Sequence, residues 1–157
     1  MSVVSSRLLL LGCMALFSLQ GGCGKDEKEA LERAQQILAA APIVDGHNDL
    51  PWVIREKFAG DVEGYDISRR AEFDTDIPRL REGQVGTQFW SVYVPSSLTP
   101  VEAAQAQLEQ IDIARRMIAL YPDDLQFATS VADIEAAQQR GRIASLLERD
   151  PLRGKPH

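Results

Sequence analysis

A histidine and an aspartate stand two residues apart in the segment Ile43-Val44-Asp45-Gly46-His47-Asn48-Asp49-Leu50-Pro51. The segment opens with apolar residues typical of a short buried β-strand. Residues two apart in extended backbone point to the same side, so the side chains of His47 and Asp49 would converge. Imidazole nitrogens and carboxylate oxygens are ligands of zinc. His47 and Asp49 are therefore candidate metal ligands, although a surface histidine beside a helix-capping aspartate would show the same spacing.

The residues around this pair predict alternating strands and helices. Strands are expected at 43–46, 85–94, 125–129 and 142–147, and helices at 29–41, 50–58, 100–121 and from Ser130 to Gly141. In the longest helix one apolar stripe is expected to face the core, formed by Val101, Ala104, Leu108, Ile111 and Ile118. The alternation predicts an α/β fold with parallel strands. A strand that ends in polar ligands before a helix is typical of a (β/α)8 barrel of the TIM type.

The first 23 residues have the features of an export signal: Arg7, an apolar run over 8–19, and small residues before Cys23. The run is about 12 residues long, too short to cross a bilayer. Because Leu19-Gln20-Gly21-Gly22-Cys23 resembles a bacterial lipobox, we expect Cys23 to be lipidated and to anchor the protein in the bacterial cell envelope. The alternative is a plain secretory signal and a secreted or periplasmic protein. Residues 24–28 are polar and predict a tether.

Composition limits the function. The 157 residues carry a net charge of −6, with no basic stripe to meet phosphates, which argues against nucleic-acid binding. Both cysteines lie within the signal region, so no disulfide is expected in the mature domain. The oligomeric state is not indicated by the sequence.

Three blocks of the sequence resemble, in order, the membrane dipeptidases, which are the renal dipeptidase family of zinc peptidases. The blocks are residues 43–51, residues 76–95, which include Asp76-Ile77-Pro78-Arg79-Leu80-Arg81-Glu82-Gly83, and Gly141-Arg142-Ile143-Ala144-Ser145-Leu146-Leu147. The resemblance implies an amidohydrolase-like (β/α)8 barrel that hydrolyses the peptide bond of dipeptides through a metal-activated water. A whole barrel takes about 250 residues, so residues 29–147 are expected to form only the N-terminal part of one, incomplete in this chain.

The resemblance also implies a site with a pair of zinc ions. By similarity His47 and Asp49 bind the first ion, a glutamate bridges both, and two later histidines complete the second. In ungapped register Asp150 stands at the bridging position and Glu148 lies two residues before it, although aspartate is shorter than glutamate and Pro151 replaces a glycine. Tyr93, at the end of the second expected strand, is a candidate for lining the substrate pocket, or simply an aromatic residue at the rim.

Residues 148–157 break the resemblance, because they contain two prolines, five charged residues and one large apolar residue. They predict an atypical tail, such as a frameshift or truncation would produce. The chain has only one other histidine, His157, so we expect weak zinc binding and no dipeptidase activity from it alone. A second hypothesis is a non-catalytic exported lipoprotein that serves as a binding module. A deaminase-like enzyme is a third, although such enzymes typically open with His-x-His.

Overall fold

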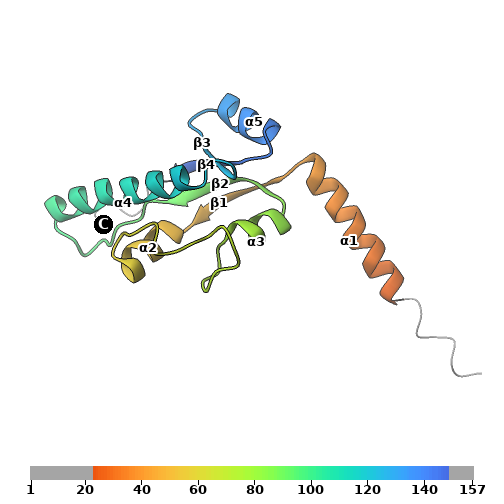
Figure 1. The fold of residues 1–157 in the computed structure, drawn as a ribbon, viewed down its shortest axis with the longest axis horizontal. Coiled ribbons are helices and arrows are strands. Elements are labelled where there is room, and N and C mark those ends of the chain that lie inside the picture. The colour runs from red at the N-terminus through yellow and green to blue at the C-terminus, as the bar shows by residue number, and fades with distance from the viewer. Residues whose placement is uncertain (1–22, 149–157) are drawn as a thin grey trace, which may run out of the picture. The chain divides into compact units, whose positions relative to one another are not determined.

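The computed structural model describes residues 23–148, beginning with helix α1 (Cys23–Ala40) (Figure 1). From Asp26 to Ala40 the side chains of this helix are exposed, apart from the half-buried Leu38. The helix begins at Cys23 rather than at Glu29, so residues 24–28, expected as a tether, are helical; their lysines and glutamate are good helix formers. Residues 1–22 of the expected signal over 1–23, and residues 149–157, including Asp150, lie outside the described residues. Between 23 and 148 no helix is both long and apolar enough to span a membrane.

The elements after α1 form a four-stranded parallel sheet with helices on both faces (Figure 1). The strands follow the order β1-β2-β4-β3 across the sheet, and each neighbouring pair is parallel. Strands and helices alternate as the sequence predicts, which confirms the α/β class. The strands are β1 (Ile43–Asn48), β2 (Val85–Ser91), β3 (Leu125–Phe127) and β4 (Ile143–Glu148), and the helices are α2 (Leu50–Phe58), α3 (Ile77–Glu82), α4 (Pro100–Leu120) and α5 (Val131–Gln139).

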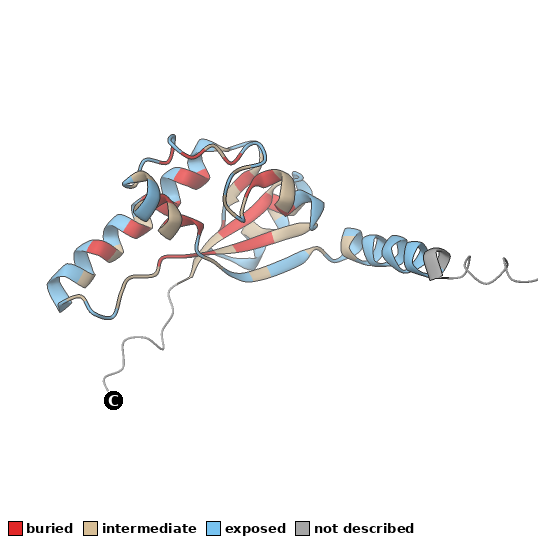
Figure 2. Cartoon of the chain, turned by 90° about the horizontal axis from the view of Figure 1, so that it is seen from below, coloured by how far each residue is buried: buried red, intermediate tan, exposed pale blue. Residues whose placement is uncertain are grey.

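The main core lies between the sheet and helices α2 and α4. Trp90 of β2, Ile54 of α2 and Met117 of α4 are almost fully buried there. A smaller cluster joins Ala137 of α5 to Ala144 of β4. Because Ala144 follows Ile143, which belongs to the main core, the two side chains point to opposite faces, and α5 covers the face away from α2 and α4. Figure 2 shows the buried residues concentrated in the strands and in patches along α4.

The face that α4 buries differs from the expected one. The predicted stripe is mostly exposed: Val101 is 79% and Leu108 is 70% accessible, and of its other members only Ile118 is buried. The other buried residues lie nearly opposite on the helix and are Ala106, Gln110, Ile113, Ala114 and Met117. The expectation was wrong because α4 carries two apolar series, and helical periodicity alone does not say which of them meets the sheet.

Strand β1 was expected to be buried and is not. Ile43 is 39% and Val44 is 61% exposed, and no residue of the strand is fully buried. The reason is its place at the edge of the sheet, where it pairs only with β2 among the described strands. The residues that form the strand were predicted from their apolar character, which is the same for an edge strand and a central strand.

The long loop between α2 and α3 is ordered by a buried carboxylate. Asp76 is fully buried and accepts hydrogen bonds from the backbone N–H of Ala71 at 3.0 Å and of Arg79 at 2.8 Å. It also forms a 2.7 Å ion pair with the Arg79 guanidinium, which in turn donates to the carbonyl groups of Ala71 and Phe73. Asp76 thereby caps α3 and ties the preceding loop to the helix.

Candidate metal centre

The carboxyl end of β1 is shaped by an irregularity in its pairing with β2. Asp45 pairs with Gln88 and Asn48 with Trp90, so three steps along β1 match two along β2, and Gly46 and His47 lie within a bulge. The Asp45 carboxylate accepts a hydrogen bond from the His47 backbone N–H at 3.2 Å. Bulges redirect side chains at sheet edges and near active sites. The backbone at His47 is thus set both by the pairing of β1 with β2 and by the Asp45 carboxylate.

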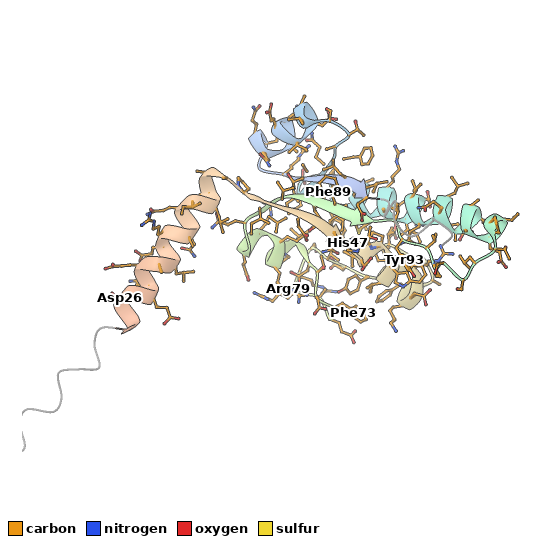
Figure 3. All side chains as sticks on the ribbon, turned by 180° about the vertical axis from the view of Figure 1, so that it is seen from behind. Asp26, His47, Phe73, Arg79, Phe89 and Tyr93 are labelled. Atoms are coloured by element: carbon orange, nitrogen blue, oxygen red, sulfur yellow. The ribbon has the colours of Figure 1, made fainter. Side chains whose placement is uncertain are left out.

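His47 and Asp49 lie together, as their spacing predicts. Nε2 of His47 is 3.2 Å from Oδ2 of Asp49, and the two side chains are 53% and 54% exposed. Figure 3 labels His47 near the end of its strand, with Tyr93 close to it in this view. The pair is therefore open to solvent and to an incoming ion.

The Asp49 carboxylate is not used to cap α2 and so can face His47. Asp49 is the N-cap residue of α2, but its side chain makes no capping hydrogen bond. Asn48 acts instead: its Oδ1 accepts from the Leu50 N–H at 3.0 Å, and its Nδ2 donates to Oγ1 of Thr75 at 3.1 Å. Asn48 thus makes the side-chain contact that a helix-capping aspartate would have made, and Asp49 faces His47.

Glu148 joins the pair, which corrects its assignment to the tail. Strand β4 continues one residue past Leu147 and ends at Glu148. Oε2 of Glu148 lies 2.9 Å from Nδ1 of His47, and the Glu148 side chain is 24% exposed. The sequence held a signal for this position, because the apolar run Leu146-Leu147 leads directly into a carboxylate, as the first strand leads into His47. The charged and proline-containing residues that follow obscured it.

The electrostatics of the site favour a positive charge. Although desolvation lowers the pKa of His47, hydrogen bonds and charge interactions with Asp49 and Glu148 raise it above its ordinary value of 6.5. The two carboxylates therefore stabilise the imidazolium more than burial destabilises it. A site that attracts a proton in this way also attracts a metal cation, and the two compete for the imidazole.

Tyr93 does not end β2, because the strand stops at Ser91. Its ring packs edge-to-face against Trp52 of α2, with 5.3 Å between the ring centroids. Both rings are half-buried. Tyr93 is thus placed by an aromatic contact beyond the strand rather than by the sheet, and its role in a substrate pocket stays a prediction.

The chemistry of the donor set fits a zinc ion in part. Two ligands of tetrahedral zinc, each about 2.0–2.2 Å from the ion, lie about 3.3–3.6 Å apart, close to the 3.2 Å between His47 and Asp49. No three His, Cys, Asp or Glu side chains between residues 23 and 148 are arranged to hold one ion. His47 and Asp49 could therefore supply two ligands to an ion, fewer than the four that zinc takes in most protein sites.

Comparison with known proteins gives one family. The family described as "Membrane dipeptidase (Peptidase family M19)" matches residues 31–150. A curated protein described as "Dipeptidase ataJ", from Aspergillus terreus, is 40% identical over 125 residues, which cover 74% of this chain and 30% of that protein. The chain thus spans less than a third of that relative's length.

Solved structures share the fold. A metallopeptidase from Rhodobacter sphaeroides, described as bound to a phosphinate mimic of the dipeptide L-Ala-D-Ala, has a TM-score of 0.57 at 18% identity over 69% of this chain and 38% of that one. The probable dipeptidase PvdM from Pseudomonas aeruginosa has a TM-score of 0.62 at 14% identity over 78% of this chain and 31% of that one. The expected part of a TIM-type α/β barrel is thereby confirmed.

Proposed function

Because this chain belongs to the membrane dipeptidase family, we propose that it forms part of a zinc-dependent enzyme that hydrolyses the peptide bond of dipeptides. The observation that carries the proposal is the 3.2 Å approach of His47 Nε2 to Asp49 Oδ2 at the carboxyl end of β1. In barrels of this kind the chemistry takes place at the carboxyl ends of the strands. The dipeptide mimic on the Rhodobacter sphaeroides metallopeptidase supports a dipeptide as the substrate.

His47 and Asp49 would hold the first of two zinc ions. A bound zinc ion lowers the pKa of a water molecule and neutralises charge that develops on the substrate carbonyl. His47 and Asp49 would position that ion at the end of the sheet, and the bulge at Gly46 and His47 would set the direction in which the imidazole leaves the strand. The remaining ligands of a two-zinc site exceed what this chain supplies, because its only other histidine is His157.

We further propose that the chain alone binds zinc weakly and has no dipeptidase activity. Two ligands cannot saturate the coordination of zinc, which takes four in most protein sites. The proposal includes an exported protein of the bacterial cell envelope, anchored through a lipid on Cys23. Incorporation of a labelled fatty acid by the wild-type chain, and not by a Cys23→Ser variant, tests this anchor.

Equilibrium dialysis of the purified chain against zinc tests the site. We expect uptake in the wild type, and its loss in a His47→Ala/Asp49→Ala variant. An Asp61→Ala/Glu63→Ala variant, which removes two exposed carboxylates from the loop after α2, serves as the control and should bind like the wild type. Equal uptake by all three proteins would overturn the assignment of His47 and Asp49.

A chimaera tests the activity. The matching segment of the Aspergillus terreus dipeptidase is replaced by residues 31–148 of this chain, and turnover of Gly-Leu is measured with zinc present. We expect turnover by the chimaera, none after His47→Ala in it, and none by the 157-residue chain itself. Gly-Leu hydrolysis by the 157-residue chain would contradict the proposed inactivity, and a folded chimaera that does not hydrolyse the dipeptide would contradict the proposed function.

A further inference from the structure

The two carboxylates beside His47 contact different edges of its ring. Asp49 Oδ2 lies 3.2 Å from Nε2, and Glu148 Oε2 lies 2.9 Å from Nδ1. The lone pairs of the two imidazole nitrogens diverge within the ring plane, so a single ion can bind only one of them. A cation held between Nε2 and Asp49 is therefore on the far side of the ring from Glu148.

The Glu148 contact is the better fixed of the two. Glu148 is part of β4, where it pairs with Ser91 of β2, and its carbonyl accepts a hydrogen bond from the Val92 N–H at 3.0 Å. Its side chain is 24% exposed, whereas that of Asp49 is 54% exposed. A hydrogen bond that is shorter and less solvated is the stronger one, because water screens it less. The single proton of a neutral imidazole should therefore lie on Nδ1, shared with Glu148.

We propose that Glu148 is a positioning residue, not a metal ligand: it accepts the Nδ1–H of His47 and so leaves the Nε2 lone pair, beside Asp49, for the cation. Histidines that ligate metals usually donate their other N–H to a carboxylate, which fixes the tautomer and the orientation of the ring and increases its basicity. The arrangement ties β4 to the end of β1 through one imidazole, across a sequence separation of 101 residues. This role rests on the proposed zinc site and adds the residue that orients it.

The test reads the tautomer of His47 directly. Long-range proton–nitrogen NMR correlations of the 15N-labelled chain, recorded without metal and at a pH where His47 is neutral, distinguish Nδ1–H from Nε2–H. A His157→Asn variant identifies the signals of the second histidine in the chain. We expect Nδ1–H in the wild type and a shift of the proton toward Nε2 in Glu148→Ala. Glu148→Gln, which keeps an acceptor oxygen at the same distance, should retain part of the Nδ1–H form.

Zinc titration on the same signals gives the second readout. We expect the Kd for zinc to rise about 10–100-fold in Glu148→Ala and less in Glu148→Gln, as is usual when the partner of a ligating histidine is removed. Asp49→Ala is the matched control, because it removes a ligand on the other edge of the ring. It should abolish zinc binding and leave the proton on Nδ1. Backbone amide spectra establish that each variant is folded.

The outcomes separate the two proposals. Zinc binding as tight in folded Glu148→Ala as in the wild type, or a wild-type His47 protonated on Nε2, overturns the role of Glu148 and leaves the zinc site standing. Loss of zinc binding in Glu148→Gln as complete as in Asp49→Ala also overturns it, because Glu148 would then be a ligand. The wild-type chain could also show the Glu148-dependent tautomer and take up no zinc. That result overturns the proposed zinc site and, with it, the role of Glu148 in orienting a zinc ligand.

Discussion

Replacing Asp76 by alanine should destabilise the protein far more than replacing any exposed carboxylate of the same loop. Asp76 is fully buried and accepts hydrogen bonds from Ala71, from the Arg79 backbone and from the Arg79 guanidinium. The substitution removes all three acceptor contacts at once. It leaves two backbone donors and a partly buried cation without their carboxylate.

The magnitude follows from the surroundings of the two partners. Removing one member of a buried ion pair costs about 3–5 kcal/mol, and loss of an N-cap side chain costs about 1 kcal/mol. The two terms overlap, because the same carboxylate supplies both. Arg79 is 31% exposed and keeps its contacts to the carbonyl groups of Ala71 and Phe73. The lower end of the range of about 3–5 kcal/mol therefore applies. We expect Asp76→Ala to lower the free energy of unfolding by about 3 kcal/mol, a large part of the total for a domain of this size.

Urea unfolding followed by circular dichroism measures the effect. With a slope of about 1–3 kcal/mol per M urea, the midpoint should fall by about 1–3 M. Asp61→Ala is the control: Asp61 is exposed and its Oδ1 accepts the Glu63 N–H at 3.0 Å, so a change of about 0.5 kcal/mol is expected. A loss below about 1 kcal/mol in Asp76→Ala would refute the reasoning.

The pH dependence gives an independent check. Burial raises the pKa of the Asp76 carboxyl, but hydrogen bonds from Ala71 and Arg79 and the Arg79 charge lower it more, so it lies below its ordinary value of 3.8. A group with a depressed pKa contributes its stabilisation above the unfolded-state pKa and loses it as the pH falls through the folded-state pKa. The difference in unfolding free energy between wild type and Asp76→Ala should therefore be full above about pH 5 and shrink in stronger acid. A difference that stays constant into acid would contradict the assignment.

Three further substitutions test the packing. Gly86→Ala should cost about 1–3 kcal/mol in urea unfolding, because an added Cβ would lie 2.5 Å from the Cβ of Pro42; a neutral result would contradict that close approach. Thr99→Ala breaks the capping box of α4 and should lower the free energy of unfolding by about 1 kcal/mol, measured by far-ultraviolet circular dichroism; an unchanged unfolding midpoint would contradict the contribution of the cap. Ile113→Ala should cost about 2–5 kcal/mol because the side chain is 4% exposed, whereas Leu108→Ala, at 70% exposed, should change the unfolding midpoint little; equal effects would show that the buried face of α4 is misassigned.

Local signals predicted much of the fold. Helix α2 has the bounds expected from the proline near its start and the glycine after its end, and α4 begins at the capping box of Thr99 and Glu102. These features depend on a few neighbouring residues, and the chemistry that satisfies the first backbone N–H groups of a helix is local. The convergence of His47 and Asp49 was predictable for the same reason, because it needs only extended backbone over three residues.

What the sequence did not predict depends on contacts between distant segments. The buried face of α4 is chosen by the sheet, and the exposure of Val44 by the position of β1 at the edge. The contact between Glu148 and His47 joins residues 101 apart, and no local pattern links them. The end of β2 at Ser91 was also missed, since the apolar and aromatic residues through Val94 continue the strand pattern.

The strand that carries His47 has one side of its backbone unpaired within residues 23–148, and Val44 stands exposed on it. Such a border accepts another extended segment through main-chain hydrogen bonds, whether from the same molecule or a different one. At rising concentration the 157-residue chain should therefore associate with itself along this border, and His47 and Asp49 at its end would be buried in the process.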